Sequence, residues 1–304
     1  MVIETLIRLP HPIPYQGSKR GLAPLIVPYV PGNIDSWFEP FAGSAAMSLL
    51  VAHRKLARRI VIADSLDSVS ELWTAIIARP GVAARRYRQI WEGQETSGPD
   101  YFYSIRDRYN SSRDPVDLLY LICRCVKNAV RFSKTGAFTQ SVDKRRLGMR
   151  PDKMEVAILE ASALLRGRTE VRTGDWLDTT TDAGPRDFLY MDPPYLGTSV
   201  GRDKRYAEQM ARDRLIEGLQ GLLARNVRFA LSYDGATGGK HYGPPLPPEL
   251  GLTRLFLHAG LSSQATLNGR REETIESLYL SHAPGVHVAN VIRKPSMTQE
   301  SMAF

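Results

Sequence analysis

The stretch DFLYMDPPYLG, residues 187–197, decides how the middle of the chain is organised. Its first half is a short apolar and aromatic run that is typical of a buried strand, and the run ends at Asp192. Pro193 and Pro194 follow. Proline has no amide hydrogen to donate and restricts the residue before it to extended conformations. The chain therefore does not continue as a helix here, and we expect the carbonyls after the strand to face a cleft as hydrogen-bond acceptors.

Similar apolar runs recur along the chain with helical segments between them. Strands are predicted at residues 36–41, 58–65, 169–176, 187–192, 227–233, 252–259 and 274–281. Helical spacing follows three of these runs, at residues 44–55, 68–78 and 207–226. Strands that alternate with helices predict a mostly parallel sheet covered on both faces. The last two strands have no helix between them, which predicts a hairpin at one edge and hence a Rossmann-like, mixed seven-stranded sheet of the α/β class.

Residues 75–165 interrupt this alternation. The segment is polar and helical, with few strand signals, so we interpret it as an inserted, mostly α-helical domain. The α/β domain is then expected to consist of residues 1–74 and 166–283. Residues 284–304 are expected to form a loosely attached tail.

The basic residues of the chain are concentrated within this helical insertion. The formal net charge is +8, and residues 124–153 contain nine Lys or Arg against two acidic residues. Asn, Ser, Thr and Phe side chains are interleaved with them, and such groups contact phosphates, base edges and base faces. The pattern favours a nucleic-acid surface, with candidate contacts from Arg124, Lys127, Asn128, Arg131, Lys134, Lys144, Arg145 and Arg146.

Membrane, disulfide and metal chemistry have little support in the sequence. No apolar run reaches the roughly 18 residues of a membrane span, and residues 1–15 lack the small-residue cleavage site of a signal peptide. Cys123 and Cys125 stand two positions apart with no His pair nearby, so we expect neither a disulfide nor a zinc site. We expect a cytoplasmic protein without a metal ion.

Acidic residues stand at or near the ends of four predicted strands, namely Glu39, Asp64, Asp175 and Asp192. Ligands of open parallel sheets bind at the carboxyl ends of the strands, so these carboxylates are expected to gather at one edge. In the turn FEPFAGSAAM, Gly43 would allow a ligand to approach the backbone before a helix. Asp64 follows Gly43 by 21 residues, a spacing that suits binding of ribose hydroxyls. The complete G-x-G-x-x-G fingerprint is absent, which argues against NAD or FAD.

Asp192 and the Pro193 carbonyl form two adjacent acceptors, and Tyr195 adds a flat aromatic face. This set matches the exocyclic amine of a planar base. The amine is a poor nucleophile while its lone pair is shared with the ring, and two acceptors on its N–H groups favour a pyramidal nitrogen. The sequence therefore predicts attack by a base amine on an electrophile.

Five motifs, in order along the chain, resemble the AdoMet-dependent DNA adenine-N6 methyltransferases of the Dam-like alpha class: YQGSK (15–19), EPFAGSA with Phe41 and Gly43, IADS with Asp64, Gly174-Asp175-Trp176 and Asp192-Pro193-Pro194-Tyr195. The resemblance covers residues 12 to 281. It implies catalytic roles for Asp192, Pro193, Pro194 and Tyr195. It also implies that AdoMet is bound by Tyr15, Lys19, Glu39, Phe41, Gly43, Asp64, Asp175, Trp176 and Asp192.

The same resemblance implies a mechanism and partners. The helical insertion stands where this class has its target-recognition domain, so double-stranded DNA is the expected partner, with the target adenine flipped out of the duplex. A role in restriction-modification with a cognate endonuclease, and a monomeric state, are expected too. The sequence departs from the family in two places: Ala45 replaces a second glycine, and Arg145 and Arg146 lie in a loosely matching segment.

Other functions stay open on the residues alone. Cytosine-N4 methylation uses the same amine chemistry, although those enzymes more often have serine where Asp192 stands. Methylation of RNA or of a protein glutamine amide is more distant. A non-enzymatic nucleic-acid-binding protein would explain the basic segment but not the acidic strand ends, and a nicotinamide oxidoreductase would need the missing glycine fingerprint.

Overall fold

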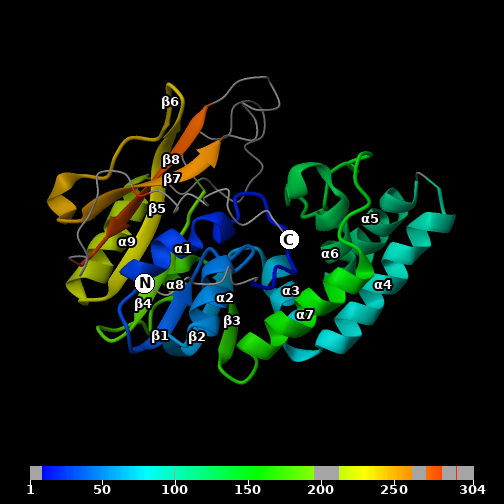
Figure 1. The fold of residues 1–304 in the computed structure, drawn as a ribbon, viewed down its shortest axis with the longest axis horizontal. Coiled ribbons are helices and arrows are strands. Elements are labelled where there is room, and N and C mark those ends of the chain that lie inside the picture. Colours follow the sequence, from blue (N-terminus) through cyan, green and yellow to red (C-terminus); the bar gives the residue numbers. More distant parts are fainter. Residues whose placement is uncertain (1–8, 99, 195–211, 262–271, 283–291, 293–304) are drawn as a thin grey trace, which may run out of the picture.

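The computed structural model describes residues 9–98, 100–194, 212–261, 272–282 and 292. Several expected features lie outside these residues: Tyr195, the start of the helix expected at 207–226, and nearly all of the tail expected at 284–304. In the described part, a sheet with its covering helices lies beside a group of helices (Figure 1).

One sheet organises the first region. Its described strands are β1 (Ile34–Glu39), β2 (Ala57–Asp64), β3 (Thr169–Thr173), β4 (Phe188–Met191), β5 (Arg228–Thr237), β6 (Lys240–Tyr242), β7 (Thr253–Leu261) and β8 (Glu273–Leu280). They are ordered β3-β2-β1-β4-β5-β8-β7, with β6 paired to β5. The first five in this order are parallel, and β8 and β7 pair antiparallel. All seven expected strands are confirmed. The three-residue β6 was missed because it is too short to show a periodic pattern.

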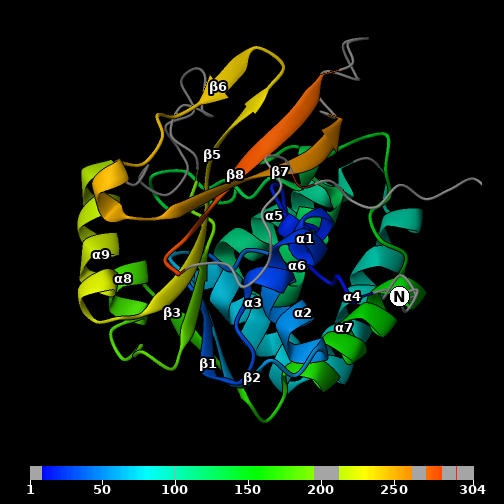
Figure 2. The same cartoon turned by 60° about the vertical axis from the view of Figure 1, so that its left-hand side comes forward.

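Alternating side chains divide the core between the two faces of the sheet. Trp37 of β1 lies in one buried cluster, with residues of α1 (Ala23–Ile26), α2 (Ala46–His53) and α3 (Asp67–Ala78). Its neighbour Phe38 lies in the other cluster, with α8 (Trp176–Thr179) and α9 (Arg212–Ala224). Successive residues of a strand point to opposite faces, so a strand covered on both sides must be apolar throughout. This explains why the central strands read as continuous apolar runs, and Figure 2 shows the helices on either side.

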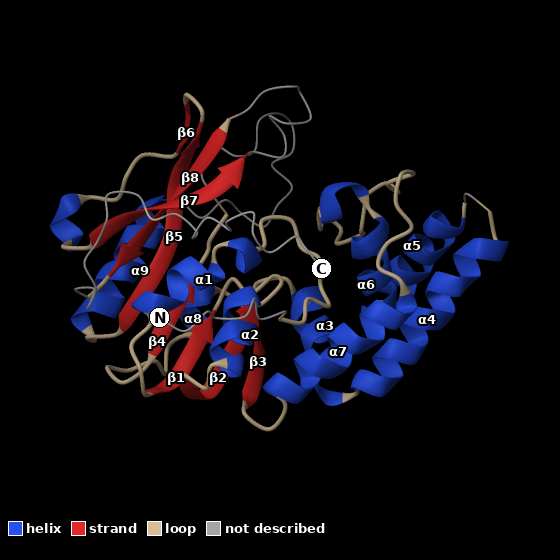
Figure 3. Ribbon diagram, in the orientation of Figure 1, coloured by secondary structure: helices blue, strands red, loops and turns tan. Residues whose placement is uncertain are grey.

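The second region is built from helices (Figure 3). They are α4 (Pro80–Thr96), α5 (Tyr101–Ser112), α6 (Pro115–Arg124) and α7 (Pro151–Leu165). The helix α3 packs against β2 and β3 and also against α6 and α7, so it connects the two regions. The expected first residue of the insertion, 75, lies within α3. None of the described helices combines the length and apolarity needed to cross a membrane.

An ion pair with a buried carboxylate joins the helices α5 and α6. Asp117 of α6 is fully buried, and its carboxylate accepts hydrogen bonds from Nε and Nη2 of Arg108, both at 2.6 Å. Such a two-point contact satisfies both carboxylate oxygens and sets the relative orientation of the two helices. Asp114 caps the start of α6 by accepting the amide hydrogens of Val116 and Asp117.

Candidate active site

The strand order reverses between β1 and β4. These two strands are parallel neighbours, while the chain continues outward from β1 to β2 and β3 on one side and from β4 to β5 on the other. Such a crossover point is where open α/β sheets bind ligands, beyond the carboxyl ends of the strands. Glu39 is the last residue of β1 and Asp192 directly follows β4. The fold therefore brings these two carboxyl groups to the place where a ligand is expected.

Lys19 connects the N-terminal motif to this point. Its Nζ lies 2.8 Å from Oδ1 of Asp192 and 3.4 Å from Oε2 of Glu276, and only 9% of its side chain is exposed. Burial by itself disfavours the ammonium, but Asp192 and Glu276 outweigh it and raise the pKa of Lys19. Burial raises the pKa of the Asp192 carboxyl to about 6, opposed by Lys19 and reinforced by Glu276. At neutral pH the two groups thus form an ion pair.

Glu39 is near enough to Asp192 for the two carboxyl groups to act on each other, and it is 4% exposed. Its Oε2 accepts hydrogen bonds from the Ser48 amide at 2.7 Å and from the Ser48 hydroxyl. The Ser48 oxygen in turn accepts the indole hydrogen of Trp37 at 3.0 Å. Burial raises the pKa of Glu39 to about 7, against the hydrogen bonds from Ser48. The network fixes Glu39 at the start of α2, where a negative charge would also be stabilised by the helix dipole.

Hydrogen bonds fix the loop between β1 and α2 at Gly43 and Ser44. The Gly43 amide donates to Oδ2 of Asp64 at 3.0 Å, and the Gly43 carbonyl accepts the indole hydrogen of Trp73 at 2.9 Å. The Ser44 hydroxyl lies 2.8 Å from the hydroxyl of Ser18. Burial raises the pKa of Asp64, opposed by its hydrogen bonds from backbone amides. The loop, the end of β2 and the N-terminal motif therefore form one connected unit.

A side chain at Gly43 would meet the Tyr15 ring. Its φ is +46°, and a Cβ there would lie 3.2 Å from Cδ1 of the Tyr15 ring. The ring of Tyr15 thus covers the glycine. Ala45 also has a left-handed backbone, with φ of 46° and ψ of 37°, and is fully buried. A residue at this position needs a small side chain, so alanine serves where the family often has glycine.

Asp175 and Trp176 are both placed at the edge of the site but have structural contacts. Asp175 caps α8 through the Leu177 amide at 2.9 Å and pairs with Arg214 at 2.9 Å. Trp176 is 1% exposed, and its ring packs 6.2 Å from that of Phe41. A Cβ at Gly218 of α9 would lie 2.4 Å from this indole. Trp176 therefore packs in the core, and Asp175 is the more accessible of the two.

The turn after β4 is described only in part. Pro193 is buried, Pro194 is exposed, and Tyr195 lies outside the described residues. Asp192 itself is 20% exposed, so it can be reached from the cleft. Of the expected catalytic residues, the described ones lie at the crossover point beside Lys19.

The basic segment forms a hairpin-like loop between α6 and α7. Isolated bridges join Cys125 to Val142 and Phe132 to Phe138. The tip is fixed to α5, where Asn110 exchanges two hydrogen bonds with the backbone of Phe138 at 2.7 and 3.3 Å. This anchoring gives the exposed basic residues a defined framework.

Asp143 binds two arginines that were expected to contact DNA, and these two arginines differ in their exposure. It is buried, and it accepts hydrogen bonds from Nε of Arg145 at 3.1 Å and from Nε of Arg146 at 3.0 Å. These bonds, the one from Arg145 first, lower the pKa of Asp143 to about 2. Arg146 also donates to the Asn128 side chain and the Cys125 carbonyl, both at 3.1 Å. Arg146 thus secures the loop, whereas Arg145 has 76% of its side chain exposed.

The other residues expected to contact DNA also divide into half-buried and exposed ones. Arg124 is half-buried and donates to the Asp143 carbonyl at 3.1 Å, and Arg131 is likewise half-buried. Lys127, Lys134 and Lys144 are exposed. Lys127, Asp143, Arg145 and Arg146 line a cavity of about 420 Å³. Lys127 and Arg145 are exposed cations that line this cavity.

A backbone contact joins the two halves of the site. The Gln16 amide donates to the Asn128 carbonyl at 3.2 Å. Lys127 and Asn128 have left-handed backbones, with φ of 60° and 52°, and Asn128 fixes this turn by donating to the Ile122 carbonyl at 2.9 Å. The N-terminal motif, which contains Lys19, therefore touches the basic loop directly.

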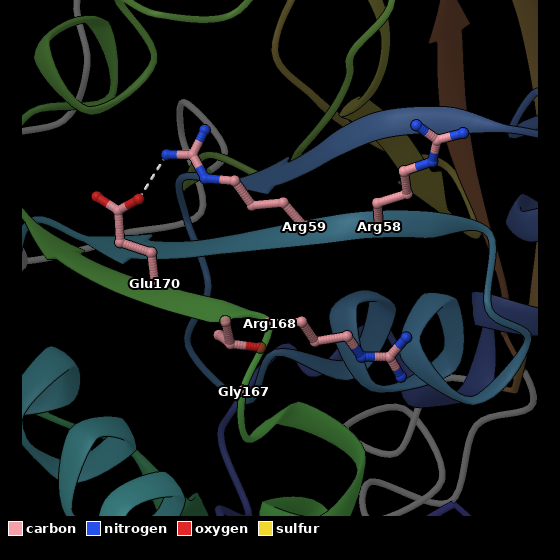
Figure 4. A pocket seen from close by; sticks show the side chains of 6 residues that line it. Arg58, Arg59, Gly167, Arg168 and Glu170 are labelled. Carbon is pink, nitrogen blue, oxygen red and sulfur yellow. Dashed lines mark hydrogen bonds and ion pairs between the residues drawn. The ribbon is translucent and has the colours of Figure 1, made fainter.

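A second cavity lies at the opposite end of the strands, where β2 and β3 begin (Figure 4). Its charged residues are compensated within the protein: Arg59 contacts Glu170 at 2.5 Å and Asp182 at 3.2 Å, and Arg168 donates to backbone carbonyls. This cavity is therefore far from the crossover point, and we assign it no part in the site.

Three features of the site were missed from the sequence: Glu276, the Ser18–Ser44 contact and the role of Asp143. Glu276 lies in a strand, where an acidic residue shows no functional pattern. Asp143 was counted only as a reduction of the positive charge. A buried carboxyl group is signalled by its partners in space, which a linear motif does not reveal.

A Rossmann-like sheet with a glycine loop and carboxyl groups at its crossover point defines an α/β protein of the methyltransferase fold. The chain belongs to the family of D12 class N6 adenine-specific DNA methyltransferases, whose model matches residues 15–241. The fold and the family resemblance expected from the sequence are thereby confirmed.

Curated relatives agree with this assignment. The chain is 23% identical over 286 residues to the type II methyltransferase M.FokI of Planomicrobium okeanokoites, covering 91% of this chain and 40% of the relative. It is 25% identical over 243 residues to the modification methylase StsI of Streptococcus sanguinis, covering 76% and 36%. It is 25% identical over 190 residues to the DNA adenine methylase of Serratia marcescens, covering 61% and 67%. The chain thus spans less than half the length of the first two relatives.

Proposed function

We propose that this protein is a site-specific DNA methyltransferase that transfers a methyl group from AdoMet to N6 of an adenine flipped out of duplex DNA. The observation that carries the proposal is the position of Asp192. Its carboxylate stands at the crossover point of the sheet, directly before two prolines, with Lys19 on one oxygen. Membership in the D12 family supports adenine N6 as the target over cytosine N4.

The residues around the cleft fit AdoMet. Gly43 packs against the Tyr15 ring, where an added Cβ would lie 3.2 Å from Cδ1, so two residues expected to bind AdoMet lie side by side. Asp64 accepts hydrogen bonds from backbone amides and keeps acceptor capacity beyond them, which suits a ribose hydroxyl. The acidic groups near Lys19 suit a sulfonium cation. AdoMet, when bound, supplies an electrophilic methyl group.

The residues of this chain orient the substrate amine and stabilise the charge that develops on it. Lys19 fixes Oδ1 of Asp192, which leaves Oδ2 and the Pro193 carbonyl to accept the two hydrogens of the substrate amine. An ionised Asp192 also stabilises the positive charge that develops on N6 during transfer. The proton is lost after the methyl group is attached, so the chain needs no covalent intermediate. Tyr195 completes the proposed site by stacking on the base.

We assign the two regions to two tasks. Residues 1–74 and 166–283 form the catalytic domain, residues 75–165 the target-recognition domain, and 284–304 a tail. The exposed cations Lys127, Lys134, Lys144 and Arg145 support phosphate contacts, because each neutralised phosphate releases a counterion. Two relatives are named modification methylases or type II methyltransferases. We therefore place this chain in a restriction-modification system, as a cytoplasmic monomer beside a cognate endonuclease.

Expression in a methylation-deficient bacterium, with single-molecule sequencing of the genomic DNA, tests the proposal. N6-methyladenine in one sequence context is expected for the wild type. The Asp192→Asn variant removes the charge with little change in shape and is expected to lose at least about 10³-fold in rate while it still binds AdoMet. Methylcytosine, or full activity of Asp192→Asn, would refute the assignment.

A further inference from the structure

Glu276 is the acidic residue of the site that no motif indicates. It lies on β8 with 18% of its side chain exposed, and its Oε2 is 3.4 Å from Nζ of Lys19. The same Nζ contacts Asp192 at 2.8 Å. One buried ammonium therefore joins the carboxylate after β4 to a carboxylate from an antiparallel strand near the sheet edge.

Gly235 of the neighbouring strand allows β5 to approach the backbone of β8 closely beside Glu276. Gly235 of β5 is paired directly with Glu276, and directly opposed side chains in an antiparallel pair lie on the same face. A Cβ at Gly235 would be 2.6 Å from the Ile275 carbonyl oxygen and 3.3 Å from Cα of Glu276. Only glycine fits there without displacing β8.

An irregularity in β5 directly precedes this pair. The register of β5 and β8 shifts between Ser232 and Gly235, and Asp234 within the shift has a left-handed φ of 53°. Asp234 is fixed there by two bonds from Arg254, at 2.9 and 3.0 Å, and one from the Tyr279 hydroxyl at 2.7 Å. Bulges beside active sites commonly redirect a side chain. The fixed bulge sets the position of Glu276.

Among the described residues, the ionisable groups that act on one another at this point are Lys19, Asp192, Glu276, Glu39 and the Tyr190 hydroxyl. A buried ammonium with a single carboxylate partner can rotate about its long side chain, whereas two carboxylates define its position. The negative charge of Glu276 also acts on Asp192 and raises the pKa of that carboxyl.

We propose that Glu276 is a positioning residue for methyl transfer. It anchors the ammonium of Lys19 so that Lys19 remains hydrogen-bonded to Oδ1 of Asp192 and Asp192 presents its other oxygen to the substrate amine. The inference rests on the proposed function, because it assigns Glu276 a part in the same reaction. Glu276 acts through Lys19 and has no direct contact with the reacting atoms.

The Glu276→Gln variant tests this role with its shape nearly unchanged. The expected result is a kcat lowered about tenfold, with KM for AdoMet and DNA within about twofold, because orientation is lost but the substrates still bind. The acid limb of the kcat/KM profile is expected to move to lower pH, since Asp192 loses a negative neighbour. Glu276→Asp keeps the negative charge, so the acid limb of its kcat/KM profile is expected at the wild-type pH. Its kcat is expected to lie between that of Glu276→Gln and that of the wild type.

Glu273→Gln is the matched control. Glu273 lies on the same strand, is 53% exposed and pairs with His258 at 3.2 Å, so the variant changes the same charge outside the site. It is expected to show wild-type kcat and an unshifted profile. Wild-type kcat in Glu276→Gln, or a loss of kcat with an unmoved acid limb, would overturn the inference. Absence of adenine methylation by the wild-type protein would instead refute the proposed function.

Discussion

Replacing Gly43 by alanine tests whether the loop after β1 is a cofactor cradle. The added Cβ would lie 3.2 Å from Cδ1 of Tyr15, closer than ordinary van der Waals contact, so the ring must move by a few tenths of an ångström. The left-handed φ of +46° adds a backbone cost of about 1–2 kcal/mol. Overlap with the ring adds about 1 kcal/mol more.

Gly167 supplies a matched control for this substitution. Its φ is +82°, but nothing lies within 4 Å of a Cβ built there, and it is at the far end of the sheet. Gly167→Ala therefore carries the backbone cost without the ring contact. Both variants should unfold at lower temperature, by about 2–4 °C for each kcal/mol.

Isothermal calorimetry of AdoMet binding distinguishes the two variants. Gly43→Ala is expected to weaken the affinity for AdoMet about tenfold or more, equivalent to about 1.4 kcal/mol, because Tyr15 and the loop backbone both shift. Gly167→Ala should bind AdoMet as the wild type does. If Gly43→Ala binds AdoMet with unchanged affinity, the loop around Gly43 is a structural turn and the cofactor site lies elsewhere.

Two further predictions concern the basic loop and the pH dependence. Arg145→Gln should weaken DNA binding and reduce the slope of log affinity against log salt by about one. Arg146→Gln should lower the thermal midpoint more than Arg145→Gln does, because Arg145 holds only the Asp143 side chain, whereas Arg146 holds Asp143, the Asn128 side chain and the Cys125 carbonyl. Equal stability of the two variants would contradict this division. The pKa of about 6 for Asp192 predicts an acid limb in kcat/KM near pH 6, with protonation below it removing the acceptor and lowering the rate about tenfold at pH 5. A flat profile from pH 5 to 8 would show that ionisation of Asp192 is not required.

Local patterns in the sequence were sufficient for the sheet and for the main motifs. All seven expected strands are present. The central parallel strands, such as β4, were predictable because a strand buried on both faces must be a continuous apolar run, which is visible in the sequence of that strand alone. The strand-end position of Asp192 followed from the apolar run before it and the prolines after it. The tertiary structure then added β6, whose three residues show no period.

The electrostatics of the site could not be derived from the sequence. A buried charge is stable only beside a partner, and the partners of Lys19 come from segments far apart along the chain. The same reason separates Arg145 from Arg146, which are adjacent and identical in the sequence but differ in what Asp143 and Asn128 allow them to contact. The sequence by itself thus determined which strands form and where their ends carry acidic groups. Only the tertiary structure decided which charged groups meet, because burial and distance, on which ion pairing depends, are properties of the folded chain.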